Sequence, residues 1–465
     1  MNTSTPSLKE QMIWVLSDLS NLNAGLFAKE ERLLKENAQQ LKEIFSTQNE
    51  ISNFFKNEFN VVWGPALINQ QREVTIDVYK AIPKELADQF PTGGKIKVTG
   101  YTTTNAMYVT KGKDPQTGRD LYVVAVSGTN PVSQAGWFQE DFDVKGTPVS
   151  WPPQYLEING LTNVGAIAQG SNDGLELLWT VQDPDTNQTL YGFLESVISG
   201  TSPAEVAVCG HSLGGALSPL VATALADLQP VANKKNVVIS AYPTAGPTSG
   251  DADFAKHVYS TLNGNYVSRI NDYDVVPHGW QESTMDELPN LYSDLKVQKE
   301  NNSSVIGIPA STIINGFIFW AKGKRGKNVY NRIQGDIPFK GSIYVQDRES
   351  LLSTAEELLK NVDIKAAFTS ISFGMEGFKL KYHLKETVAD FLAYMMEAGV
   401  QHTSVYGQDC FNIPGPLAEA LQQYVNLFTL SPEAMAEVKE IVVELVKDVA
   451  SYVAIYGPHA NSKVL

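Results

Sequence analysis

The chain has 465 residues and a formal net charge of -15, and 43% of its residues are hydrophobic while 19% are charged. This composition is typical of a globular protein and excludes a disordered or collagen-like chain. The negative charge argues against a general attraction to phosphates, so no nucleic-acid partner is expected. With only Cys209 and Cys410 present, a disulfide scaffold is also excluded.

The N-terminal stretch MNTSTPSLKEQMIWVLSDLS has neither the basic start nor the uninterrupted apolar run of a secretory signal peptide. A cytoplasmic location is therefore expected by default, although export by another route leaves no such mark. Apolar residues such as Leu33, Leu41 and Ile44 recur at helical spacing. Residues 1–90 are accordingly predicted to be a helical extension that packs on the core.

Residues 91–280 are predicted to form an α/β core. Two β-rich stretches flank a turn sequence at 113–119 and predict a hairpin. Short apolar runs then alternate with a helical pattern, which indicates a mainly parallel sheet with helices on both faces. The predicted strands lie at 95–112, 121–129, 205–209, 236–243 and 266–272, and the helix at 215–228.

Residues 281–400 exceed the usual length of a connection and predict a cap-like insertion. Within it, residues 303–321 carry no charge and are followed by a basic cluster. A membrane span is rejected because Pro309, Asn315 and Gly316 interrupt the run. Two interpretations stay open, a buried part of the cap or an apolar surface that docks on aggregated substrate or membrane. Residues 401–465 predict a loop followed by C-terminal helices.

The sequence VAVCGHSLGGALSPLV at 206–221 predicts a nucleophile elbow. A serine on a sharp strand-to-helix turn needs small residues two positions before and after it, and Gly210 and Gly214 provide them around Ser212. The helix N-terminus would then point at the serine hydroxyl, so that the amide of Leu213 can bind an oxyanion. An apolar strand before the turn and a helix after it match the context that this motif requires.

Serine needs a base and an orienting acid, which this kind of fold normally supplies in the order serine, acid, histidine. Asp272 and Asp274 follow the strand YVSRI, and Asp274 is preferred because an apolar pair and a proline come after it. Among the histidines, His402 lies in a loop-like stretch that suits a base reaching over the sheet. His278 is too near Asp274 in sequence to be the obvious base, but it is a candidate for lining the pocket.

These motifs together resemble the fungal-type class 3 lipases, which have an α/β-hydrolase fold. The resemblance covers roughly residues 95–280 and would not arise by chance in this order. Its stretches are TNAM at 104–107, VAVSGT at 124–129, Trp137 with Asp141, TPVSWPP at 147–153, the elbow, AGPTSGDADFAKHV at 245–258 and NDYDVVPH at 271–278.

The resemblance implies a triad of Ser212, Asp274 and His402, and an oxyanion hole made by the amides of Leu213 and Thr129. The Thr129 hydroxyl is a possible further donor. Ser127 stands where the family usually has an arginine, which leaves the chemistry intact and puts in doubt what that arginine anchors.

The family resemblance also implies a lid just after the oxyanion residue, where Trp137 and Phe138 are candidates for covering the site and touching lipid. Ordinary packing of a surface helix is the alternative. Within the uncharged run, Phe317 and Phe319 are predicted to line the acyl pocket.

The sequence therefore predicts a serine carboxylic ester hydrolase, foremost a triacylglycerol lipase or lipid esterase. The alternatives are a phospholipase, an esterase for soluble esters, and a lipase-fold protein that binds without catalysis. The expected partner is a lipid or other ester, with possible transient contact with a lipid surface. No metal or cofactor is implied. Acyl chain length, headgroup and oligomeric state are not determined by the sequence.

Overall fold

The computed structural model describes most of residues 5–292 and shorter stretches up to residue 425. The described residues are 5–22, 28–56, 58–77, 95–128, 144, 146–198, 203–228, 236–262, 264–292, 325–343, 352–353, 356, 389, 393–394 and 396–425. Within these ranges, no helix is long and apolar enough to cross a membrane.

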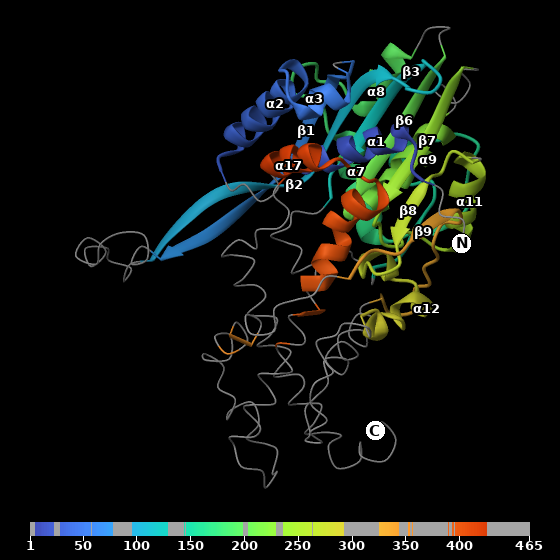
Figure 1. The fold of residues 1–465 in the computed structure, drawn as a ribbon. Helices are drawn as coiled ribbons and strands as arrows, with labels where there is room; N and C mark the ends of the chain where they lie inside the picture. The colour runs from blue at the N-terminus through green and yellow to red at the C-terminus, as the bar shows by residue number, and fades with distance from the viewer. Residues whose placement is uncertain are drawn as a thin grey trace.

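A seven-stranded sheet with the order β1-β2-β3-β6-β7-β8-β9 forms the centre of the described chain (Figure 1). The strands are β1 (Asn60–Asp77), β2 (Lys95–Lys113), β3 (Asp120–Val126), β6 (Ala204–His211), β7 (Val237–Thr244), β8 (Ser268–Asn271) and β9 (Asp336–Phe339). Strands β1, β2 and β3 pair antiparallel, whereas all pairs from β3 to β9 are parallel. The short strands β4 (Val149–Ser150) and β5 (Ala166–Ile167) form a separate antiparallel pair.

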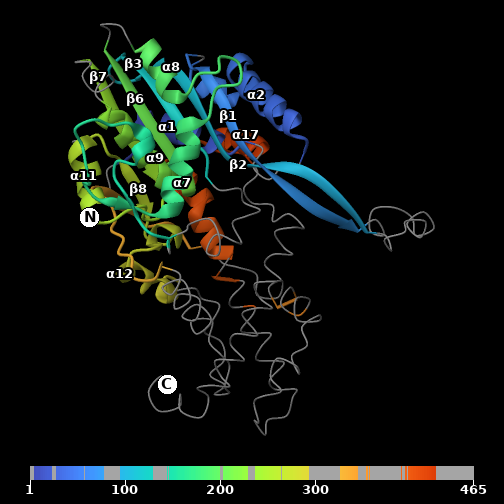
Figure 2. The same ribbon diagram turned by 180° about the vertical axis from the view of Figure 1, so that it is seen from behind.

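Helices pack on both faces of the sheet, and the view from behind in Figure 2 brings the second face forward. The first face carries α1 (Leu8–Leu19), α2 (Glu30–Ser46), α3 (Glu50–Phe54) and α17 (Gly415–Tyr424). The second face carries α7 (Gln169–Thr180), α8 (Leu190–Val197), α9 (Leu213–Asp227) and α11 (Ala252–Leu262). The short helix α12 (Glu282–Met285) and single turns at Gln154–Leu156, Val276–His278 and Leu288–Asn290 lie in the connections.

Alternation along β3 divides the interior into two apolar cores. Tyr122, Val124 and Val126 face the core under α9, whereas Val123 and Ala125 face the core under α1. Successive side chains of a strand point to opposite faces, so one buried strand supplies both cores. The predicted α/β-hydrolase architecture, with a mainly parallel sheet between helices, is confirmed.

Several boundaries differ from the predictions. The range 1–90 was expected to be helical, yet it contains the long strand β1, in which Gly64 and Pro65 and several polar residues obscure the strand pattern. The predicted cap range 281–400 contains β9, which pairs with β8 in the main sheet. The run 303–321, with Phe317 and Phe319, lies outside the described residues. Cys209 and Cys410 are both free and buried.

Candidate active site

The strand-to-helix turn after β6 holds Ser212 in a strained conformation. Its φ of 59° and ψ of -124° are unusual for a residue with a side chain. A methyl group on Gly210 would collide with the backbone of Gly214, and one on Gly214 would collide with the carbonyl of Val126. The two glycines therefore permit the close backbone approach that presents Ser212 at the end of β6.

The carboxylate of Asp274 faces the imidazole of His402 across a large separation in sequence. Nδ1 of His402 lies 3.0 Å from Oδ1 and 2.9 Å from Oδ2 of Asp274. Both side chains are buried, with exposed fractions of 1% and 0%. When Nδ1–H donates to the carboxylate, a neutral imidazole has its lone pair on Nε2, the atom that can take up a proton.

Tyr406 adds a further donor to the same carboxylate. Its hydroxyl donates to Oδ2 of Asp274 at 3.0 Å and accepts the backbone N–H of Asn271 at 3.1 Å. The backbone N–H of Val276 donates to Oδ1 at 3.0 Å. Burial raises the pKa of Tyr406 well above its usual value, and the nearby charge of Asp274 adds to this, so the phenol keeps its proton and stays a donor.

His211, the residue before Ser212, packs against His402. The two ring centroids are 4.7 Å apart, and Nδ1 of His211 lies 3.1 Å from the hydroxyl oxygen of Thr244. Burial lowers the pKa of His211 well below its usual value, and the charge of His402 lowers it further. A neutral His211 does not repel a positive charge that develops on His402.

Gly128, two residues after β3, lies directly against Ser212. A methyl carbon on Gly128 would be 3.3 Å from Cβ of Ser212 and 2.9 Å from the carbonyl oxygen of His211. Leu213 is the first residue of α9, so its N–H is among the helix amides that have no partner within the helix. Thr129, the other predicted oxyanion residue, lies outside the described residues.

Ser127, which stands in place of the family's arginine, fixes the end of β3 to β2. Its hydroxyl accepts the N–H of Ala106 at 2.6 Å, and its own N–H donates to the carbonyl of Ala106 at 2.9 Å. A short side chain thus anchors the loop to the sheet through the neighbouring backbone.

The remaining described histidines have other partners. Nδ1 of His278 lies 2.7 Å from the carbonyl oxygen of Asp274, and Nε2 of His257 lies 2.8 Å from Oδ2 of Asp227. His278 therefore sits beside the acid without reaching its carboxylate. His383, His459 and the lid candidates Trp137 and Phe138 lie outside the described residues.

One local expectation about His402 is wrong. A loop was predicted around it, but residues 396–402 are helical, followed by a π-helical turn at Tyr406–Cys410. Gly399 and Gly407 suggested a loop, yet Gly407 is needed where the ring of Trp14 packs against the backbone. No pattern in the sequence predicts Tyr406 as a partner of Asp274 or His211 as a neighbour of His402.

Within the described parts of the chain, no group of three or more His, Cys, Asp or Glu side chains is arranged to hold a metal ion. His402 contacts Asp274 and packs against His211, the residue before Ser212. These residue types are suited to proton transfer and nucleophilic attack.

Comparison with known proteins finds a family that is similar to the central part of the chain. The sequence model of "Lipase (class 3)" matches residues 123–283. A curated lipase of Rhizomucor miehei is 31% identical over 176 residues, which is 38% of this chain and 40% of that lipase. The chain therefore aligns with less than half of the length of this relative.

Solved structures are similar over a longer part of the chain. The crystal structure of M37 lipase matches with a TM-score of 0.56 and 22% identity, covering 90% of this chain and 98% of that one. A Rhizomucor miehei lipase propeptide complex matches with a TM-score of 0.34 and 19% identity, covering 60% of this chain and 67% of that one. The first match supports the fold.

Proposed function

We propose that the chain is a serine hydrolase of the class 3 lipase family, whose model matches residues 123–283, and that it cleaves carboxylic esters of lipids, foremost triacylglycerols. Ser212 is the nucleophile, His402 the general base and acid, and Asp274 the residue that orients and stabilises the imidazolium. The amides of Leu213 and Thr129 bind the oxyanion.

The proposed reaction has two halves. Oγ of Ser212 attacks the acyl carbon while Nε2 of His402 takes the hydroxyl proton, and the same proton passes to the leaving alcohol as the ester bond breaks. Water then attacks the acyl-enzyme, gives its proton to Nε2 and releases the acid, and the serine hydroxyl is restored. Each half passes through a tetrahedral oxyanion, which the two amides stabilise.

The observation that carries this proposal is the pairing of Nδ1 of His402 with the carboxylate of Asp274, at 2.9 Å and 3.0 Å. This pairing supports a triad whose members follow one another along the chain in the order serine, acid, histidine. The strained turn that holds Ser212 supports its role as the nucleophile. The neutral His211 and the proton-retaining Tyr406 support the same roles, because neither opposes the charge that develops on His402.

Labelling of Ser212 is the primary test. The wild type is expected to hydrolyse nitrophenyl esters and to be labelled by a fluorophosphonate probe, whereas Ser212→Ala loses both because the nucleophile is gone. Activity of Ser212→Ala within roughly tenfold of wild type would remove Ser212 from the mechanism. Failure of the probe to label wild type, together with absent hydrolysis, would favour the non-catalytic alternative.

Two histidine variants test the base. His402→Ala is expected to be about as inactive as Ser212→Ala, since residues that act as a unit lose activity together. His278→Ala serves as the matched control because its ring also contacts Asp274, but through the backbone carbonyl, and it is expected to retain measurable turnover. An inactive His278→Ala beside an active His402→Ala would reverse the assignment.

The substrate class requires a separate measurement. A nitrophenyl ester series of increasing chain length tests for an acyl pocket, and a lipase is expected to gain activity when the substrate exceeds its solubility limit, whereas an esterase for soluble esters is not. Phospholipid hydrolysis distinguishes the phospholipase alternative.

We also propose that Phe317 and Phe319 line the pocket. In that case Phe317→Asp lowers the hydrolysis of long-chain esters more than that of acetate esters.

A further inference from the structure

Asn271 is the last residue of β8 and lies three positions before Asp274. It is fully buried, with an exposed fraction of 0%. Its backbone carbonyl accepts the N–H of Asp274 at 3.0 Å. Its backbone N–H donates to the hydroxyl of Tyr406, which in turn donates to the carboxylate of Asp274. The backbone of Asn271 therefore holds the proposed acid both directly and through Tyr406.

The side chain of Asn271 reaches the segment that carries His402. Nδ2 lies 2.9 Å from the backbone carbonyl oxygen of Gln401 and 2.7 Å from Oε1 of the same residue. An amide nitrogen has two hydrogens, which suffice for these two acceptors. The carbonyl of Gln401 and the N–H of His402 belong to one planar peptide. Asn271 thus holds the peptide that leads into His402, and this peptide lies in a helical stretch.

The oxygen of the same carboxamide is also bonded. Oδ1 accepts the N–H of Tyr273 at 3.1 Å and the N–H of Gly341 at 3.0 Å. Because Oδ1 faces two donors and Nδ2 faces two acceptors, the amide fits in one orientation only. Asn271 therefore connects the end of β8 to the segment after β9 and to the helical stretch before His402.

These three segments pack closely around the carboxamide. A methyl carbon on Gly341 would be 2.4 Å from Oε1 of Gln401 and 3.1 Å from Nδ2 of Asn271. Nε2 of Gln401 extends the network, since it donates to the carbonyl of Ser342 and to Oε1 of Glu397, both at 2.7 Å. Gln401 and Glu397 have exposed fractions of 0%. A buried polar network of this kind favours one defined geometry of the segments that it joins.

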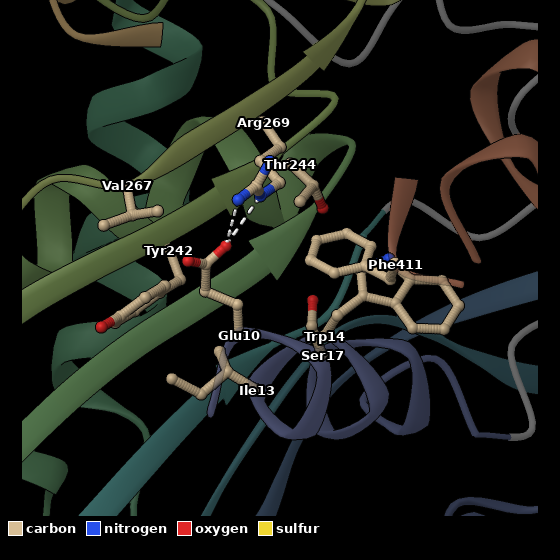
Figure 3. Close-up of a pocket in the computed structure, with 9 residues that line it drawn as sticks. All are labelled: Glu10, Ile13, Trp14, Ser17, Tyr242, Thr244, Val267, Arg269 and Phe411. Atoms are coloured by element: carbon tan, nitrogen blue, oxygen red, sulfur yellow. Dashed lines mark hydrogen bonds and ion pairs between the residues drawn. The ribbon is translucent and has the colours of Figure 1, made fainter. Parts of the chain in front are cut away.

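Helix α1 packs against both sides of this junction. The carboxylate of Glu10 accepts from Arg269, on β8, at 2.6 Å and 2.7 Å, as Figure 3 shows. Nε2 of Gln11 donates to the carbonyl of Phe411 at 2.7 Å, and the rings of Trp14 and Phe411 stack with their centroids 5.4 Å apart. Both aromatic side chains line the small pocket drawn in Figure 3. One helix therefore contacts the strand that leads to the proposed acid and the segment that follows the proposed base.

We propose that Asn271 is a positioning residue for the pair of His402 and Asp274. It acts through the peptide before His402 and does not touch the reacting atoms. The bond to Asp274 sets the rotation of the imidazole, whereas Asn271 sets where the backbone of His402 stands relative to the acid. This inference rests on the proposed function, because the pair has a catalytic role only if His402 is the base for Ser212.

The first test compares Asn271→Ser with Asn37→Ser. Asn271→Ser keeps an oxygen that can accept the N–H of Tyr273, two residues on, but its side chain is too short to donate to Gln401. We expect kcat to fall by about tenfold with KM changed less than about twofold, because a displaced base raises the barrier without weakening the binding of the ester.

Asn37→Ser is the matched control for the loss of a buried amide. Asn37 is also buried, and its Nδ2 donates to the carbonyl of Leu33 at 2.9 Å, within α2. The control is expected to keep kcat within about twofold of wild type. An unchanged kcat in Asn271→Ser, or an equal loss in Asn37→Ser, would overturn the role of Asn271.

The proton between His402 and Asp274 gives a readout that a general loss of stability does not move. An imidazole N–H donated to a buried carboxylate resonates far downfield of the backbone amides in proton NMR, and isotope labelling of the histidine nitrogens assigns it. At low temperature, the resonance is expected in wild type and in Asn37→Ser, and lost or moved upfield in Asn271→Ser. An unmoved resonance in Asn271→Ser would contradict the proposal.

Asn271→Asp tests the donation to Gln401 separately, and it covers the case in which Asn271→Ser does not fold. It has the shape of the native side chain and keeps an acceptor for the N–H groups of Tyr273 and Gly341, but it presents an oxygen to Gln401 in place of the amide donor. We expect it to lose kcat and the downfield resonance as Asn271→Ser does. Wild-type kcat in Asn271→Asp would show that the donation is dispensable and would overturn the proposal.

The two proposals fail in different ways. If wild type neither hydrolyses esters nor reacts with a fluorophosphonate, the proposed function is overturned and the role of Asn271 falls with it. If wild type is active and Ser212→Ala is not, while Asn271→Ser matches Asn37→Ser, only the role of Asn271 is overturned.

Discussion

Asp274 accepts hydrogen bonds from His402, Tyr406 and the backbone of Val276. A fully buried carboxylate is stable as an ion only when such donors replace water. The donors come from segments far apart in the chain, so the geometry of the acid depends on how those segments pack.

Tyr406→Phe removes one of these donors and leaves the N–H of Asn271 without its acceptor. We expect kcat to fall by about two- to twelvefold, corresponding to the roughly 0.5–1.5 kcal/mol of a typical hydrogen bond. Tyr155→Phe is a suitable control, because it also removes a hydroxyl hydrogen bond, at 3.2 Å to the carbonyl of Asn172, on the other face of the sheet. Steady-state kinetics on a soluble ester measures both, and equal kcat values would contradict the role of Tyr406.

The sequence distinguished Asp274 from Asp272 because an apolar pair follows Asp274. In the structure Asp272 is exposed and Asp274 is buried against His402. The catalytic roles themselves stay predictions. The hydrogen bond from the N–H of Gly128 to Oδ1 of Asn21 could not have been predicted from the sequence. It spans 107 positions and depends on where α1 docks.

The contact between α9 and β7 determines how closely the elbow can pack. A methyl group on Gly215 would collide with the carbonyl oxygen of Thr244, the same oxygen that accepts the N–H of Ser212 at 3.1 Å. The backbones of helix and strand therefore approach without an intervening side chain.

Gly215→Ala is expected to destabilise the protein by roughly 1–3 kcal/mol, because the backbone must move to make room. Gly399→Ala is the matched variant, since it lies in a helical stretch with nothing within 4 Å of the added methyl group. It is expected to stabilise by about 0.5–1 kcal/mol. Urea unfolding measures both, and a neutral Gly215→Ala would show that the contact can relax.

The core strands and α9 were predictable because apolar periodicity and turn residues agree with the final packing. Strand β9 was not, because it has only four residues and contains Pro338. β9 is defined as a strand by its pairing with β8. A pairing between segments far apart in the chain leaves no local pattern in the sequence.

Asp18 makes the free energy of unfolding depend on pH. Burial in the last turn of α1 raises the pKa of its carboxyl to about 7, and a negative charge is also unfavourable near a helix C-terminus. The unfolded chain ionises this group near pH 4, so the folded protein binds more protons between about pH 4 and pH 7.

The free energy of unfolding is therefore expected to decrease from about pH 4 to pH 7, by at most about 1.4 kcal/mol per pH unit from this group, and to level off above pH 7. Asp18→Asn lacks the titrating group, so its stability relative to wild type should increase over that range. Thermal melts of both proteins at pH 4, 6 and 8 measure the difference. Curves that stay parallel across this range would exclude Asp18 as the source.

The hydrogen bond between Gln11 and Phe411 joins positions 400 residues apart, and this separation has a consequence for synthesis on the ribosome. Helix α1 is synthesised long before its partners on β6, β7 and β8, and Phe411 follows Gln11 by 400 positions. Loop closure over such a distance delays docking until the late segments are present. Until then the apolar face of α1 has no complete surface to pack against, so the nascent chain depends on α1 remaining undocked while the rest of the sheet assembles.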